Sequence, residues 1–156
     1  MTEMSTRDLP QASALPKVRA LVAAIRDGHD RDMRQAGEAA GLSTRHAHYY
    51  GLAATITLGL ASAGERLEVT ALGSELLATA RGSLDERAVL RRAIADSLSV
   101  TSIAPDLVDE DGPTLEALTH RLIHAGLSAH TARRRASTLL SWRRYVLDPQ
   151  VSLTDI

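Results

Sequence analysis

Basic and hydroxyl side chains follow two Gly-Leu-Ser triplets, which begin at positions 41 and 126 and are therefore 85 residues apart. A guanidinium group can donate two parallel hydrogen bonds to a phosphate or to the edge of a guanine base. The free amides of a first helical turn can also bind a phosphate. This chemistry suits contact with duplex DNA, and the candidate contact residues are Ser43, Thr44, Arg45, His48, Tyr49, Ser128, His130, Arg133, Arg134 and Ser137.

The first group lies on a predicted helix that Ser43 caps and that runs from Thr44 to about Leu58. Apolar residues recur along it at three- or four-residue spacing and should face the core: Ala47, Tyr50, Ala54 and Leu58. Arg45 then points outward from the first turn, where it can bond guanine O6 and N7. The alternative is that Arg45 and His48 are ordinary solvated side chains.

The second group lies on a predicted helix from Ser128 to about Val146. Arg133 and Arg134 fall on the side opposite its apolar stripe, and Arg135 flanks that stripe. From Leu118 to Leu147 the sequence has six arginines and no acid, which fits phosphate contacts. The alternative is that these arginines neutralise the segment from Asp106 to Glu116, which holds five acids and no base; Arg135 would then pair with Asp109 or Glu110.

Local signals place the remaining elements of the first half. Periodic apolar residues predict a helix over 15–27, and Asp30 or Asp32 can cap a short helix that Gly41 ends. Two strands, 60–63 and 66–70, are predicted around a Gly64-Glu65 turn, followed by a helix that Thr70 caps. Arg66 at the hairpin tip can enter a minor groove, although most exposed hairpin arginines do not. This order is that of a winged helix-turn-helix.

The second half predicts a similar order. Residues 83–86 have the pattern of a capping box that opens a helix reaching Leu98. An irregular acidic connector is expected over 100–113, and Thr114 can cap a helix that Gly126 ends. Only residues 146–153 remain to form a second wing. The repeated helix, Gly-Leu-Ser, helix order predicts a mainly α fold with a small β-hairpin wing, built as a tandem winged helix-turn-helix. We expect a flexible tail over 1–12, a winged unit over 13–82 and a helix-turn-helix-like unit over 83–156.

Several short motifs resemble the winged helix-turn-helix modules that accompany bacterial restriction enzymes and related defence proteins. They are Thr44-Arg45, His48-Tyr49-Tyr50, Leu58-Gly59-Leu60, residues 69–77, and the Thr131, Arg134-Arg135, Thr138 and Trp142 pattern. The likeness spans about residues 15–147, but His48 stands where the family has a polar or acidic residue, and Ala71 alters the Leu-Thr pair. The resemblance implies DNA binding more than any particular biological role.

Composition excludes several classes of function. The 156 residues contain no cysteine, which excludes disulfides, thiolate metal sites and thiol nucleophiles. Lys17 is the only lysine, and no phosphate loop, nucleophile elbow or aspartate dyad is present, so we do not expect an enzyme or a cofactor. His120, His124 and His130, or His46 and His48, are more typical of scattered histidines than of a metal site. The polar N-terminus and the lack of a long apolar run predict a cytoplasmic protein.

These residues support two hypotheses for function. The first is sequence-selective binding of double-stranded DNA, by a transcriptional regulator or a target-reading module for a separate effector protein. Two units in one chain could cover two successive grooves, or a homodimer could bind a palindrome. The second is a protein-interaction adaptor built on winged helices without DNA binding, which the net charge of −1 and the mixed Glu65-Arg66 wing favour.

Overall fold

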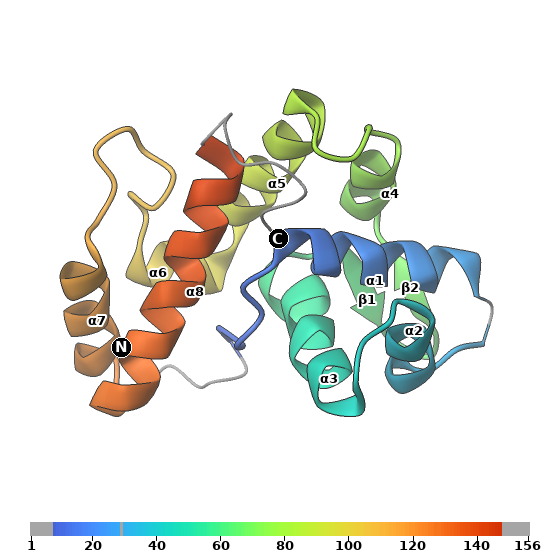
Figure 1. Cartoon of the computed structure of the whole chain (residues 1–156), viewed down its shortest axis with the longest axis horizontal. Helices are drawn as coiled ribbons and strands as arrows, with labels where there is room; N and C mark the ends of the chain where they lie inside the picture. Colours follow the sequence, from blue (N-terminus) through green and yellow to red (C-terminus); the bar gives the residue numbers. More distant parts are fainter. Residues whose placement is uncertain (1–7, 29, 148–156) are drawn as a thin grey trace.

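The protein is mainly helical, with one small antiparallel sheet (Figure 1). A computed structural model describes residues 8–28 and 30–147. This confirms the predicted class of helices with a small β-hairpin. The elements are α1 (Leu15–Asp27), α2 (Met33–Ala39), α3 (Thr44–Leu52), the π-helix η1 (Ala53–Thr57), β1 (Ala61–Ala63), β2 (Leu67–Val69), α4 (Ala71–Leu77), α5 (Leu84–Asp96), α6 (Leu98–Ile103), α7 (Leu115–His124) and α8 (Ala129–Leu147).

Side-chain caps fix the start of most helices. Asp32, rather than Asp30, caps α2 in a capping box with Gln35, whose side chain accepts from the Asp32 amide. Thr70 and Thr114 cap α4 and α7, as predicted. Helix α1 has the predicted bounds but no side-chain cap, and Pro16 occupies its first turn.

The loop of the hairpin is one residue longer than predicted. Ala63 pairs with Leu67, so residues 64–66 form a three-residue loop in place of the Gly64-Glu65 turn. Arg66 therefore lies in the loop. Helix α4 packs against the chain just before the hairpin, where a Cβ on Gly73 would lie 2.0 Å from the Leu60 carbonyl oxygen. Glycine is required there to position the hairpin against α4.

Three expectations for the second half are wrong. Ser97 caps a separate helix, with its hydroxyl accepting from the Val100 amide at 3.3 Å, so α5 ends at Asp96 and residues 100–103 are helical, not irregular. Leu98, the expected last residue of that helix, is instead the first residue of α6 and is 86% exposed. Ser83 does cap α5, but the Glu86 side chain turns into the protein and accepts from the Gly82 amide instead of completing a capping box.

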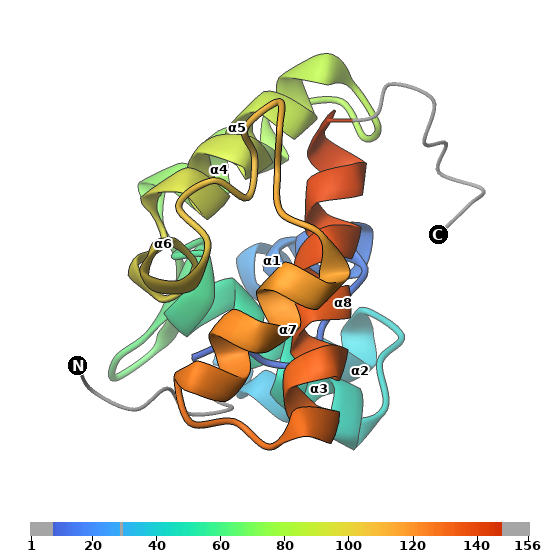
Figure 2. The ribbon, with the colours of Figure 1, turned by 90° about the vertical axis from the view of Figure 1, so that its left-hand side faces the viewer.

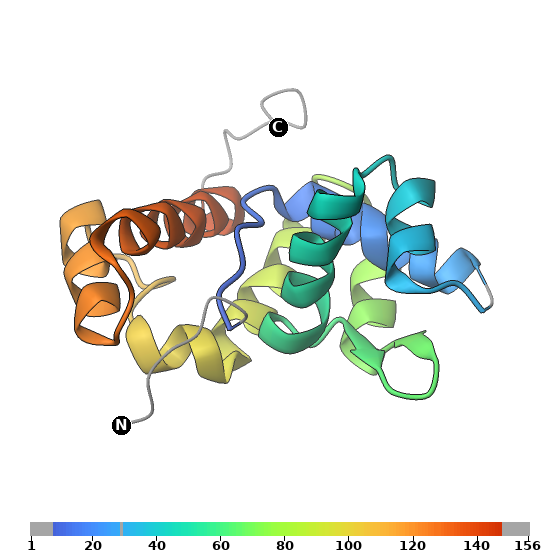
Figure 3. The same ribbon diagram turned by 90° about the horizontal axis from the view of Figure 1, so that it is seen from below.

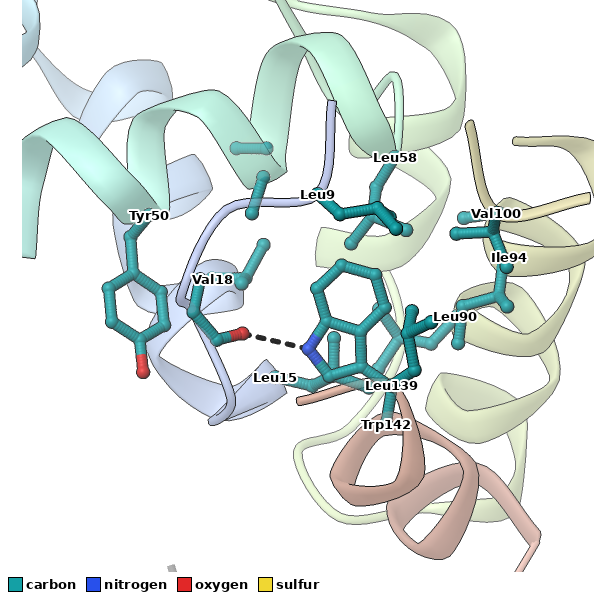
Figure 4. Packing of buried hydrophobic residues seen from close by; sticks show 14 of the residues in the cluster. Leu9, Leu15, Val18, Tyr50, Leu58, Leu90, Ile94, Val100, Leu139 and Trp142 are labelled. Carbon is teal, nitrogen blue, oxygen red and sulfur yellow. Dashed lines mark hydrogen bonds between the residues drawn. The ribbon is translucent and has the colours of Figure 1, made fainter. Parts of the chain in front are cut away.

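Residues 8–12 are packed in the core, which contradicts their assignment to a flexible tail. Leu9 and Ala12 are 2% and 0% exposed. The Trp142 indole nitrogen donates to the Ala12 carbonyl at 2.8 Å (Figure 4), and the Thr57 hydroxyl donates to the Asp8 carbonyl at 3.0 Å. The segment is ordered because it buries apolar surface and satisfies an indole donor that would otherwise be unpaired. Residues 1–7 and 148–156, including most of the possible second wing, lie outside the described residues.

One apolar core joins the two halves of the chain. Around Trp142 of α8, which is fully buried, Figure 4 shows side chains from the N-terminal segment, α1, α5 and α6. Leucine and alanine are the commonest residues of this core, and Ile94 of α5 and Val100 of α6 are fully buried in it. Helix α8 packs on α5 and α7 within the second half, and α6 packs on η1 of the first half, so the two halves are joined by tertiary contacts and not only by the connecting chain.

A buried carboxylate adds a polar link between the halves. Glu86 is 1% exposed and accepts from Arg19 of α1 at 2.5 Å and from the Tyr145 hydroxyl of α8. The Arg87 guanidinium lies 5.5 Å from the centre of the Tyr145 ring. Burial, and next the Glu86 carboxylate, raise the pKa of the Tyr145 hydroxyl well above its ordinary value. Breaking this cluster would leave a buried charge with fewer partners, which is costly.

Candidate nucleic-acid interface

Helix α3 exposes the polar side chains of its first turns. Ser43 caps it, with the hydroxyl accepting from the His46 amide at 3.2 Å. Thr44, Arg45 and His48 are exposed, as predicted, and Tyr49 is half-buried. The Arg45 guanidinium lies 5.7 Å from the centre of the Tyr49 ring, which is within the range of a cation–π contact.

The opposite face of α3 holds it against α1 and α2. Ala47 and Tyr50 are buried, and the Tyr50 hydroxyl accepts from the Ala14 amide at 3.1 Å. A Cβ on Gly37 of α2 would lie 2.3 Å from the Ala47 Cβ, so the two helices meet at a glycine and an alanine. This close contact fixes α3 with its polar face outward.

The turns before α3 and α8 have the same pattern of backbone hydrogen bonds. The Leu42 amide donates to the Gly37 carbonyl at 2.8 Å, and the Leu127 amide donates to the Leu122 carbonyl at 3.1 Å, five residues back in each case. The glycine of each turn, Gly41 or Gly126, has a positive φ, of 80° or 109°. Both turns are therefore glycine-terminated helix ends that place a capping serine at the start of the next helix.

Helix α8 exposes most of the second predicted group. Ser128, which accepts from the Thr131 amide at 3.4 Å, and His130, Arg133, Arg134 and Ser137 are all exposed. Arg135 does not pair with Asp109 or Glu110. It is 8% exposed, and its guanidinium donates to the Gln11 side-chain oxygen at 2.5 Å, because its position in the helix turns it toward the N-terminal segment. Burial, and next the charge of Arg134, lower the pKa of Arg135.

The exposed ends of α3 and α8 lie at the same edge of the molecule. In Figure 1 both helices begin at the lower edge, α8 at the far left and α3 near the middle; Figure 2 shows the molecule from its left-hand side. Residues 11–14 lie between the two helices and bond to both, through Gln11 to Arg135 and through the Ala14 amide to Tyr50 (Figure 3). The structure thus brings the N-terminal parts of α3 and α8, which carry the exposed Arg45, Arg133 and Arg134, to one edge of the protein.

The hairpin lies on the other side of α3 and carries mixed charge. The Arg66 side chain is exposed, and its guanidinium lies 4.0 Å from an Asp30 carboxylate oxygen. Glu65 and Glu68 are also exposed. The acidic residues around Arg66 therefore weaken its attraction to a phosphate. The exposed pair with Asp30 contributes little to the stability of the fold.

The acidic connector lies away from the two helix ends, at the upper left of Figure 1. Its backbone carbonyls, at Leu107, Asp109 and Glu110, accept from the Arg143 guanidinium at 2.6, 2.6 and 3.1 Å. Asp106 pairs with Arg121 at 2.7 Å, and this hydrogen bond holds the pKa of the Asp106 carboxyl below its ordinary value. The connector thus binds Arg121 and Arg143 and leaves Arg133 and Arg134 exposed.

Sequence reasoning missed two features of this region. His46 is exposed on the first turn of α3, and the outward spacing of Thr44, Arg45 and His48 could have included it. A groove also follows α3 and η1 on the side facing β1, with a volume of about 680 Å³. Thr55 and Ile56 of the π-helix line it, and the sequence carries no local signal for a π-helix there.

Within residues 8–28 and 30–147, no helix is both long enough and apolar enough to cross a membrane. The same part of the chain contains no group of three histidine or acidic side chains arranged to hold a metal ion. No protein family, curated protein or solved structure matches this chain, so a function has to be inferred from the geometry of the α3 and α8 ends.

Proposed function

We propose that the protein binds double-stranded DNA in a sequence-selective manner, with α3 as the reading helix and the start of α8 as a second contact at the same edge of the molecule. The observation that carries this proposal is the arrangement of two serine-capped helix ends at one edge of the molecule, with Arg45, Arg133 and Arg134 all exposed there. A helix N-terminus attracts phosphate through its free amides, and arginine adds charge and hydrogen-bond donors.

The two helices have different roles in this proposal. Arg45, with Thr44 and His48 beside it, reads base edges in the major groove, and the Tyr49 ring restricts the positions that the Arg45 guanidinium can take. Arg133 and Arg134, with Ser128, His130 and Ser137, contact the sugar-phosphate backbone and set the register. Arg66 has at most a secondary role because of the acids around it.

The proposed biological role is control of transcription or target reading for a separate effector in a defence-related system. It rests on the resemblance of the sequence motifs to the winged helix-turn-helix modules of restriction and defence proteins. In this proposal α2–α3 and α7–α8 are related units, and one chain spans adjacent parts of a duplex without forming a dimer.

The direct test is selection of bound duplexes from a random library at moderate salt. We expect enrichment of one sequence motif, and binding that weakens steeply as salt rises, by about one ion for each phosphate contact. Binding without enrichment would reduce the proposal to non-specific attraction. Failure to retain any duplex, with the protein shown to be folded by circular dichroism, would overturn it.

The second candidate is an adaptor that contacts another protein. The acidic surroundings of Arg66 favour it, because a hairpin with this charge is poorly suited to a phosphate backbone. This candidate predicts no salt-dependent retention of duplex DNA, so the same selection experiment separates the two.

A further inference from the structure

The groove beside α3 is mostly apolar and partly open. We call it the α3 groove and define it by its lining residues on α3, η1, α2 and β1. Ile56 of η1 lines it and is 48% exposed, which is unusual for an isoleucine in a helix that packs against the core. Leu52 and Met33, both half-buried, extend the apolar lining.

Ile56 lies in the π-helical part of the helix, four residues after Leu52. Side chains four residues apart lie on the same side of an α-helix, and also on the same side of a π-helix, whose hydrogen bonds span five residues. The Leu58 amide bonds to the Ala53 carbonyl at 2.9 Å in this wider pattern. Ile56 therefore stays on the side of Leu52, above β1, and the apolar strip continues along the helix. Single π-helical turns of this kind are frequent at functional sites.

The groove is continuous with the proposed DNA surface. Thr44 and His48, on the first turns of α3, line it as well as the exposed ridge of the helix. No acidic residue is among its described lining residues, in contrast to the hollow on the other side of the hairpin, which Asp30, Asp32 and Glu65 line. Charge thus favours an anionic partner at the α3 groove and disfavours one at the neighbouring hollow.

We propose that the α3 groove receives the C5-methyl group of thymine on the major-groove edge of duplex DNA. This inference rests on the proposed function. Thymine is the standard base that presents a methyl group in the major groove, and apolar side chains and threonine methyl groups read it by contact. Leu52 and Ile56 supply such contacts in the half of the helix that follows Thr44 and His48. Ile56 lies eleven residues after Arg45, roughly 16 Å further along the helix. The protein thus prefers a target in which thymine lies several base pairs from the one that Arg45 reads.

The experiment uses the duplex obtained by selection and replaces its thymines by uracil, one at a time, which removes a methyl group and nothing else. At one or two positions we expect affinity to fall about fourfold, the effect of one buried methyl group. The Ile56→Ser variant should lose a similar factor on the thymine duplex and should no longer distinguish thymine from uracil at that position. Leu84→Ser, at an exposed leucine that begins α5, is the control and should keep the distinction.

The possible results separate this inference from the proposed function. If the selected duplex binds equally well with uracil at every position, the methyl contact is wrong while DNA binding stands. If the thymine preference survives in Ile56→Ser, the methyl group is read elsewhere and the α3 groove is not its site. If no duplex is retained at all, both proposals fail. Because uracil substitution leaves the protein unchanged, the test does not depend on the stability of a variant.

Discussion

Helices α3 and α8 begin alike and end differently. Each follows a Gly-Leu-Ser turn with the same backbone hydrogen bonds, and each buries an alanine one turn later, at positions 47 and 132. Helix α3 then widens into η1, and Gly59, with φ of 62°, leads the chain into the hairpin. Helix α8 continues as one α-helix to Leu147, with Trp142 and Tyr145 in the core.

The difference shows that the Gly-Leu-Ser turn determines how each helix starts. Burial of the later side chains determines how the second half of the helix packs. Position 142 corresponds to Thr57 at the offset of 85 residues, and both side chains are buried, at 0% and 3% exposure. One is the largest side chain of the core, and the other is a small hydroxyl that donates to Asp8. We therefore expect changes late in α8 to affect folding, and changes early in α3 to affect binding.

The largest effect should come from Trp142→Ala. Removing a fully buried indole and its hydrogen bond to Ala12 should lower the free energy of unfolding by roughly 3–5 kcal/mol. Thr57→Ala, the matched change in η1, should cost only about 1 kcal/mol, the value of one hydrogen bond. Urea denaturation of both variants tests this. Equal losses would show that the end of α3 supports the core as much as α8 does.

Tyr145→Phe should rank next, with a loss of about 1.5–3 kcal/mol, because the hydroxyl bonds to the buried Glu86 carboxylate. The raised pKa of Tyr145 means that its contribution is present below an ordinary pKa of 10.0 and is lost as pH rises above it. The gap in stability between the wild type and Tyr145→Phe should therefore narrow between about pH 9 and about pH 11. A constant gap would show that the hydroxyl does not resist ionisation in the fold.

Arg45→Ala tests the start of α3. If Arg45 makes the proposed bidentate contact to guanine, binding should weaken by roughly 1–3 kcal/mol and preference should relax at one or two base pairs. The matched change in α8 is His130→Ala, at the position 85 residues after Arg45. It should leave the sequence preference intact. Measured affinities for the selected duplex and for single-base variants decide the matter. A uniform loss on all duplexes would assign Arg45 to phosphate.

Arg133→Ala and Arg134→Ala should have smaller, sequence-independent effects. Each should weaken binding to every duplex and reduce the slope of log affinity against log salt by about one unit. Arg144→Ala, exposed near the opposite end of the same helix, is the control and should leave the slope unchanged. Thermal unfolding should be measured beside binding. Lower stability with unchanged affinity would remove α8 from the interface.

The smallest effect is expected for Asp106→Asn, at the connector that precedes α7 and has no counterpart before α2. The partly exposed pair with Arg121 should contribute at most about 1 kcal/mol. Because the pair lowers the pKa of Asp106, this contribution is present above an ordinary pKa of 3.8 and is lost as pH falls below it. Urea denaturation of the variant and the wild type should differ at about pH 7 and coincide at about pH 3. A difference that persists in acid would indicate another role for Asp106.

Local signals in the sequence were sufficient for most of the helices and the hairpin. Capping residues such as Ser43, Thr70 and Thr114 act on amides three residues away, so their effect is encoded within one helical turn. The exposed faces of α3 and α8 could be derived from helical spacing. The proposed contact residues could therefore be placed on the surface before any tertiary contact was known.

Features that depend on distant contacts could not be predicted in this way. Arg135 points inward and donates to Gln11. The Glu86 side chain accepts from Arg19 and Tyr145 and does not complete a capping box. The order of residues 8–12 depends on Trp142, and the break at Ser97 competes with an apolar stripe that continues through it. In each case the deciding partner lies far along the chain, or a cap overrides periodicity.

The hydrogen bond from Trp142 to Ala12 also bears on how the chain folds. It joins residues 130 positions apart, and the bond from Arg135 to Gln11 joins residues 124 positions apart. Contacts between such distant residues require closure of a long loop, and they slow folding relative to local helix formation. On the ribosome the segment around Ala12 must wait for α8 to emerge before the core can close. Helices α1 to α5 are thus expected to spend that interval partly folded, with apolar surface exposed to chaperones.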